Sequence, residues 1–135
     1  MRRQFPPELQ VRIDQLNARL GASEEQLVLA GRFSDEGFFV REEGGEYLLC
    51  YFERGKVDIR HRTSSVDDLL YRFFESVTAS MALAYELRHR VPGQDFRRVA
   101  FARQEELLRQ MFPEWADRRK QEHAAILRQS PFRDG

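Results

Sequence analysis

The chain has 135 residues, of which 41% are hydrophobic, and this size and composition exclude global disorder and suit one folded domain. Its formal net charge is zero, so the chain lacks the basic excess that is typical of proteins that bind nucleic acid or anionic membranes through charge. One cysteine excludes an intramolecular disulfide, and no run approaches the roughly 18 apolar residues of a membrane-spanning helix. We therefore expect one soluble domain over residues 1–135.

The first seven residues show no targeting signal. Met1–Pro7 contains two arginines, but no apolar stretch follows them, as a secretory signal peptide would require. The expected location is therefore the cytoplasm.

The segment after Pro7 has the pattern of an amphipathic helix. Proline suits a first helical turn, and Gly21 is a typical C-terminal stop. Between them, one helical face carries Leu9, Ile13, Leu16 and Leu20. The sequence predicts a helix over residues 7–20. Over residues 22–36 two interpretations stay open, because the short apolar run Gln26–Ala30 fits either a brief helix or a strand.

From Gly37 onward the pattern changes to the two-residue period of β-strands. Strands are predicted over residues 38–43, 46–54 and 56–62, and the glycines between them are hairpin turn signals. On the third strand, one face is expected to carry Val57, Ile59 and His61. The segment therefore predicts a three-stranded antiparallel meander.

A long helix is predicted after the meander. Ser65 with Asp68 three residues later resembles a capping box, with aspartate in place of the usual glutamate. Residues 66–90 then carry a broad apolar face and contain no proline or glycine, so this helix is expected to be the central element.

Two shorter helices are predicted next. Asp95 is expected to cap a helix that runs to Met111, and Pro113 begins the last helix, before a tail over residues 130–135. One stripe of the last helix is expected to carry Trp115, Arg119, Glu122 and Ile126. The expected fold class is therefore α+β: an N-terminal helix, a three-stranded antiparallel meander, then a long helix and two further C-terminal helices packed on the sheet.

The sequence offers no pattern for a metal or cofactor site. The three histidines fall on different predicted elements, with no cysteine or histidine at ligand spacing, so no metal site is expected. A glycine-rich phosphate loop and a nucleophile elbow are both missing, so we expect no cofactor.

Two residues deserve comparison with catalytic groups. Cys50 lies in an apolar run, which favours a buried inert thiol over a nucleophile. Glu75 has apolar neighbours and is the best candidate for a partly buried acid. A structural salt bridge to Arg98 or Arg103 is the favoured interpretation, and a general acid–base role is the alternative.

Acidic residues gather between Ser34 and Glu46, where Arg41 is the one base. The acids are Asp35, Glu36, Glu42, Glu43 and Glu46. A solvated loop is one interpretation, and an anionic patch that steers a basic partner is the other. In the C-terminal half, arginines alternate with acids along the predicted helices, which indicates solvated faces and no stripe for nucleic acid.

An ordered set of short motifs resembles a known family. The second strand ends in Tyr-x-Glu-Arg-Gly at residues 51–55, and Asp95-x-Arg97-Arg98, Phe101-x-x-Gln104 and a Pro-Phe-Arg-Asp tail follow in that order. The long helix between them contributes Asp68, Tyr71, Phe74, Thr78, Met81 and Ala82. Over about residues 35–134 this order is similar to the immunity protein 63 family, found beside toxin genes in bacterial polymorphic toxin systems. The resemblance implies that the protein neutralises a cognate toxin by binding it.

Three classes of function follow. The first is a cytoplasmic immunity protein, not an enzyme, that blocks a cognate toxin domain with the five acids as its partner-binding surface. The second is a non-catalytic regulatory or scaffold domain, either monomeric or a homodimer formed through the long helix. The third is an enzyme that uses a buried carboxylate such as Glu75, which would require a deep polar pocket.

Overall fold

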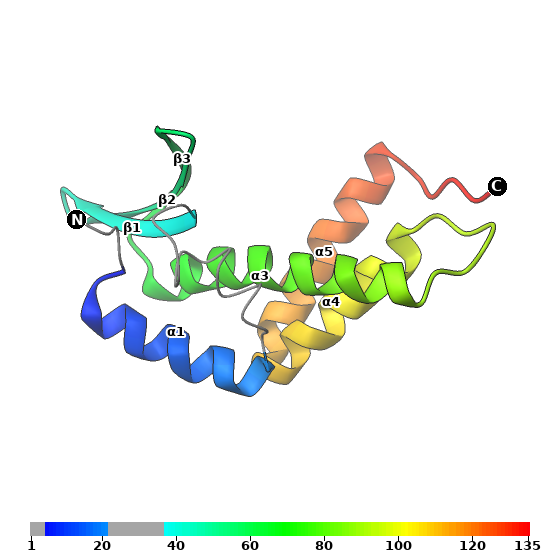
Figure 1. Ribbon diagram of the computed structural model, residues 1–135, viewed down its shortest axis with the longest axis horizontal. Helices are drawn as coiled ribbons and strands as arrows, with labels where there is room; N and C mark the ends of the chain where they lie inside the picture. Colours follow the sequence, from blue (N-terminus) through cyan, green and yellow to red (C-terminus); the bar gives the residue numbers. More distant parts are fainter. Residues whose placement is uncertain (1–4, 22–36) are drawn as a thin grey trace. The chain divides into compact units, whose positions relative to one another are not determined.

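The computed structural model describes residues 5–21 and 37–135 (Figure 1). Their contacts form two compact units, Met1–Val77 and Thr78–Gly135, and the division falls inside helix α3 (Val66–Arg88). The predicted order of elements and the α+β class are confirmed. The undecided run Gln26–Ala30 lies outside the described residues. None of the helices in the described part of the chain is long and apolar enough to cross a membrane.

Helix α1 spans Pro7–Leu20, as its apolar spacing predicts. It ends where Gly21 adopts a left-handed conformation (φ 68°), so that the Gly21 N–H donates to Asn17 O at 2.9 Å. Just before the helix, Phe5 packs edge-on against Phe73 of α3, with ring centroids 5.1 Å apart.

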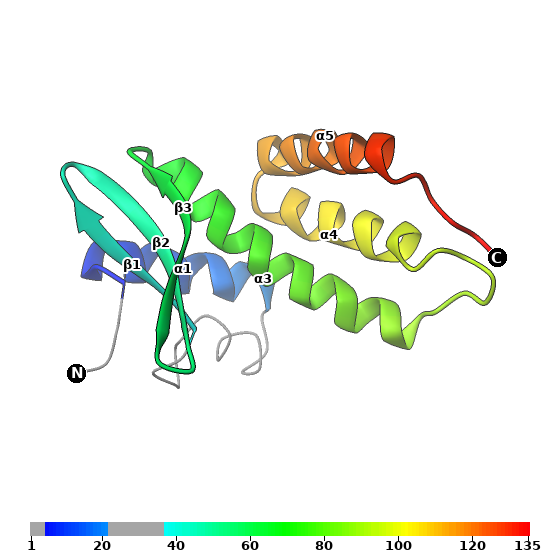
Figure 2. The same cartoon turned by 90° about the horizontal axis from the view of Figure 1, so that it is seen from above.

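The strands β1 (Gly37–Glu43), β2 (Glu46–Glu53) and β3 (Lys56–Thr63) form the predicted antiparallel meander in the order β1-β2-β3 (Figure 2). Both hairpin turns have positive φ at their two central residues, which matches the right-handed twist of the strands. The first turn uses Gly44 and Gly45, and the second uses Arg54 (φ 52°) and Gly55.

The third strand differs from its predicted pattern. The register between β2 and β3 shifts, because Ile59 pairs with Cys50 whereas His61 pairs with the adjacent Leu49. One residue of β3 is therefore extra at this point, which is a β-bulge. Val57 pairs with Phe52 and Ile59 with Cys50, so these two residues share a face of the sheet, as predicted. His61 faces the opposite side, so the prediction that it shares their face is wrong.

Helix α3 begins at the predicted cap. Ser65 Oγ accepts a hydrogen bond from the Asp68 N–H at 3.1 Å, which is half of the capping box. The other half is not formed, because the Asp68 carboxylate lies 2.6 Å from His61 Nε2 and the Ser65 N–H donates to Thr63 Oγ1.

The helix ends at Arg88, two residues before the predicted limit of 90. The histidine after it explains the early end. His89 Nδ1 lies 2.9 Å from Tyr85 O, the carbonyl that its own N–H would contact in a continuing helix. The His89 N–H instead donates to Glu86 O, one residue nearer, which tightens the last turn.

Helices α4 (Arg97–Met111) and α5 (Pro113–Gln129) form an antiparallel pair (Figure 2). Their buried apolar residues include Leu107, Leu108, Met111, Trp115 and Ala116. Of the stripe predicted on α5, Trp115 is buried but Ile126 is 39% exposed, and His123 occupies a buried position in its place.

Candidate functional site

The described part of the predicted partner-binding surface is the tip of the β1–β2 hairpin, which carries Glu42, Glu43 and Glu46. Asp35 and Glu36 lie outside the described residues. Glu43 and Glu46 are a cross-strand pair and so share one face of the sheet, whereas Glu42 lies on the other face. The fold therefore brings these three acids to one end of the sheet but divides them between its two faces.

Two arginines offset the repulsion between the facing glutamates. Arg41 Nη1 lies 3.7 Å from Glu43 Oε1, and Arg62 Nη1 on β3 lies 3.6 Å from Glu46 Oε1. All four side chains are exposed and both distances are long, so these pairs stabilise the hairpin little. Glu42 is exposed and has no ion pair among the described residues. The acidic cluster is thus weaker than the count of acids along the sequence indicates, because the fold adds Arg62.

The hairpin tip is hollowed. An open recess of about 440 Å³ is lined by Glu42–Tyr47 and Ser64. Because all three glutamates border it, the recess suits a cationic side chain of a partner better than an anion or an apolar group.

Neither candidate for a catalytic role has the surroundings of a reactive group. Cys50 is fully buried, and burial raises the pKa of its thiol, which disfavours the nucleophilic thiolate. Glu75 Oε1 lies 3.7 Å from Arg72 Nη1 on the same helix. The predicted partners are engaged elsewhere, since Arg98 pairs with Asp134 and Arg103 with Glu106.

A metal centre is not evident either. Within residues 5–21 and 37–135, no three His, Cys, Asp or Glu side chains are grouped closely enough to hold a metal ion.

A buried polar network in the second unit was not predicted from the sequence. At its centre, Gln104 on α4 donates through Nε2 to Thr78 Oγ1 on α3, at 3.2 Å. Gln104 Oε1 accepts from Arg119 Nε at 3.1 Å and lies 3.0 Å from His123 Nε2, both on α5. The network therefore links all three helices of this unit.

The imidazole of His123 is enclosed on its other sides as well. His123 Nδ1 lies 2.7 Å from Glu105 Oε2, and the ring of Phe101 stacks on the imidazole at 3.8 Å. Burial lowers the pKa of His123, and the hydrogen bond to Glu105 opposes that shift. Because these groups are bonded to one another inside the helix pair, we assign them a structural role.

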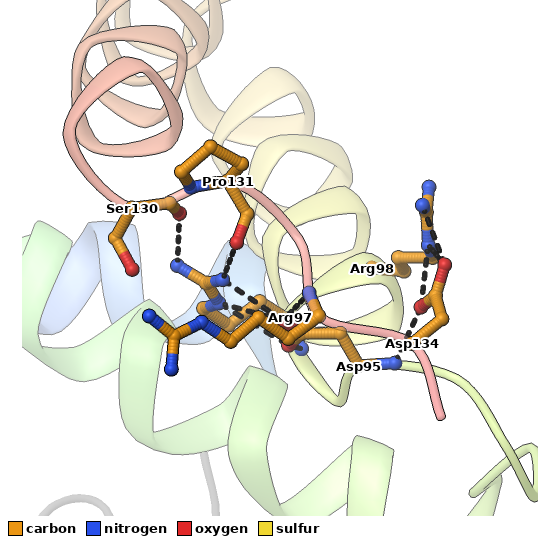
Figure 3. A network of polar contacts seen from close by, with 7 residues as sticks. Asp95, Arg97, Arg98, Ser130, Pro131 and Asp134 are labelled. Atoms are coloured by element: carbon orange, nitrogen blue, oxygen red, sulfur yellow. Dashed lines mark hydrogen bonds and ion pairs between the residues drawn. The ribbon is translucent and has the colours of Figure 1, made fainter.

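The motifs Asp95-x-Arg97-Arg98 and Pro-Phe-Arg-Asp, distant in sequence, meet in the structure (Figure 3). The Asp95 carboxylate accepts hydrogen bonds from the N–H groups of Arg97 and Arg133 and from the Arg97 guanidinium, at 2.8–3.3 Å. These bonds hold the pKa of Asp95 well below its ordinary value. Phe96 already has helical dihedrals, so Asp95 acts as the cap of α4, as predicted.

The same contacts fix residues 130–135, which we call the C-terminal strap. Arg98 forms a two-pronged ion pair with Asp134, and Arg97 donates to the carbonyls of Ser130 and Pro131 (Figure 3). The guanidinium of Arg98 lies over the ring of Phe132, with Cζ 4.1 Å from the ring centroid. The loop between α3 and α4 is thereby tied to the end of the chain.

Comparisons with known proteins show which family the chain belongs to. The family model for Immunity protein 63 matches residues 43–125, which include β2, β3, α3, α4 and most of α5. No curated protein and no solved structure matches the chain. The match spans more than half of the 135 residues and covers the motifs between residues 51 and 104 that carry the resemblance. The chain therefore belongs to the Immunity protein 63 family.

Proposed function

We propose that this protein protects its cell by binding a cognate toxin domain directly in the cytoplasm, without catalysing a reaction. The observation that carries the proposal is the family match over residues 43–125. The surroundings of Cys50 and Glu75 support the non-catalytic part, since one thiol is buried and the carboxylate is paired.

We further propose the hairpin tip as a contact surface for the toxin. Like charges directly opposite each other destabilise an antiparallel pair, so the Glu43–Glu46 pair does not serve the stability of the hairpin. Exposed charges of this kind act mainly on the rate of association, because they steer a partner of opposite charge before contact. The expected partner surface is therefore basic at the point that meets the recess.

The test uses the purified chain and the toxin domain encoded by the neighbouring gene. Co-purification of the two tests the function itself. For the site, we expect the triple variant E42K/E43K/E46K to slow association about tenfold at low salt, with a smaller effect as ionic strength rises. The matched control is Glu53→Lys, at the opposite end of β2, which should leave the association rate unchanged.

Among the single variants, Glu42→Lys is the most informative. Glu42 has no ion pair among the described residues, so its reversal should slow association without changing the melting temperature. If the triple variant associates as fast as the wild type, the hairpin tip is not a contact surface. If the wild type itself does not bind the toxin, the proposed function is wrong.

A further inference from the structure

The second unit exposes apolar side chains in one segment. Among the described residues, eight large apolar side chains are exposed, and four of them lie between residues 83 and 96. They are Leu83, Leu87, Val91 and Phe96, from the last turns of α3 to the start of α4. We call residues 83–96 the α3–α4 corner. Leu87 is 67% exposed, more than any other large apolar side chain that the structure describes. Clustered exposure of this kind marks interaction surfaces, whereas isolated exposed apolar residues are ordinary.

Hydrogen bonds cross-link the corner although its apolar side chains are exposed. The Glu86 carboxylate accepts two hydrogen bonds from Arg90, at 3.0 and 3.1 Å, and the Gly135 N–H donates to Gly93 O at 2.9 Å. Asp95 then joins the corner to the strap through the Arg133 N–H. A partner that binds here pays little conformational entropy to order the loop, which is the benefit of preorganisation in binding.

The exposed charges around the corner that have no ion pair among the described residues are both basic. Arg90, Arg97 and Arg98 are each paired with an acid. The side chains of Arg88 and Arg133 are exposed and have no ion pair among the described residues. The corner therefore combines exposed apolar side chains with two arginines that have no ion pair among the described residues, and this combination complements an apolar pocket bordered by carboxylates.

The hairpin tip does not supply such an anchor. Its recess is lined by glutamates, glycines, Tyr47 and Ser64, and exposed charges contribute more to association rate than to affinity. Affinity in protein complexes comes chiefly from a few well-packed anchors, whose loss speeds dissociation. A tight toxin complex thus requires an apolar contact outside the hairpin.

We propose that the α3–α4 corner is the apolar anchor for the toxin, with Leu87 at its centre and with Arg88 and Arg133 facing acidic residues of the toxin. This assignment rests on the proposed function, and it adds a second surface, in the other unit of the chain. In this proposal, the function of the C-terminal strap is to hold the anchor in its binding conformation.

The test compares two exposed apolar residues on helices. Leu87→Asp should raise the Kd for the toxin domain at least about tenfold, mainly through faster dissociation. Val11→Asp is the matched control, because Val11 is 57% exposed on α1 in the first unit, and it should bind like the wild type. Arg88→Glu should weaken binding by about threefold relative to Arg12→Glu, an exposed arginine of α1. Leu87→Ala repeats the test without adding a charge.

The outcomes separate the proposals. If Leu87→Asp and Leu87→Ala bind with the wild-type Kd and melt at the wild-type temperature, the anchor assignment is overturned while the toxin-binding function stands. If the wild type sediments as a dimer and Leu87→Asp as a monomer with unchanged toxin affinity, the corner binds a second copy of this chain and the assignment is again wrong. If the wild type does not bind the toxin, both proposals fall together.

Discussion

At the scale of single residues, Asp95 makes more contacts than its place in a loop indicates. One carboxylate oxygen accepts the Arg97 N–H, as in a helix cap, and the other accepts the Arg133 N–H from the strap. The Arg97 guanidinium donates to both oxygens. The Asp95 carboxylate is thus surrounded by N–H donors from Arg97 and Arg133, which suits an anion whose two oxygens both accept.

Asp95→Asn should therefore lower the melting temperature by several degrees at neutral pH, although the two side chains have the same shape. In either orientation, the asparagine NH₂ group points at N–H donors of Arg97 or Arg133. Thermal unfolding followed by circular dichroism measures the change. Asp117→Asn is the control, because its ion pair with Arg109 is exposed on both sides and its loss should have little effect.

Asp95→Asn also tests how the stability of the protein depends on pH. Hydrogen bonds from Arg97 and Arg98 hold the pKa values of Asp95 and Asp134 below those of the unfolded chain. A lowered pKa adds stability that is complete above the unfolded value of about 3.9 and is lost as the pH falls below it. The difference in melting temperature between wild type and Asp95→Asn should thus shrink as the pH falls from about 5 to about 2. A difference that stays constant across this range would contradict the assignment.

At the scale of elements, the α3, α4 and α5 segments of the second unit are joined through the amide of Gln104. Gln104→Leu preserves the approximate shape but removes one partner each from Thr78, Arg119 and His123. Because buried polar groups that lose a partner are costly, we expect the free energy of unfolding to fall by about 2–3 kcal/mol. Urea denaturation measures it against Gln121→Leu, an exposed glutamine of α5 that should be neutral. Equal midpoints for the two variants would mean that the network contributes nothing.

Local patterns in the sequence predicted most element boundaries. The glycine turns and two-residue alternation predicted the meander, and Gly21 and Pro113 marked helix ends correctly. These features depend on near neighbours, so they can be inferred without the fold. The end of α3 was missed because it depends on the ring of His89, a side chain that does not usually stop a helix.

Contacts between distant segments could not be inferred in this way. The sequence showed the acids of the hairpin but not Arg62, which reaches Glu46 through the pairing of β3 with β2. The alternation of apolar and charged residues along β3 does not reveal the β-bulge that places Ile59 and His61 on opposite faces of the sheet. The sequence predicts only a tail over residues 130–135, although the motifs at residues 95–98 and 131–134 contain the charges that bind the strap. A search for complementary charges between that tail and the α3–α4 loop would have been the available signal.

At the scale of the whole molecule, the division into two units at Val77 and Thr78 raises the question of how many domains unfold. We propose that residues 1–135 form one domain, because the boundary cuts a continuous helix, and breaking α3 in the middle would expose hydrogen-bonded backbone on both sides.

The chain carries a built-in probe in each unit. Cys50, its one cysteine, is buried in the first, and Trp115, its one tryptophan, is buried in the second. In a urea titration, brief pulses of a thiol reagent should therefore report unfolding at the same midpoint as tryptophan fluorescence, since coincident transitions are the mark of a single cooperative unit. If Cys50 becomes reactive at a clearly lower urea concentration than the one that exposes Trp115, the first unit unfolds by itself and the chain has two domains. In that case a toxin could engage the hairpin and the α3–α4 corner as separate modules, and substitutions in the two surfaces would change the binding free energy additively.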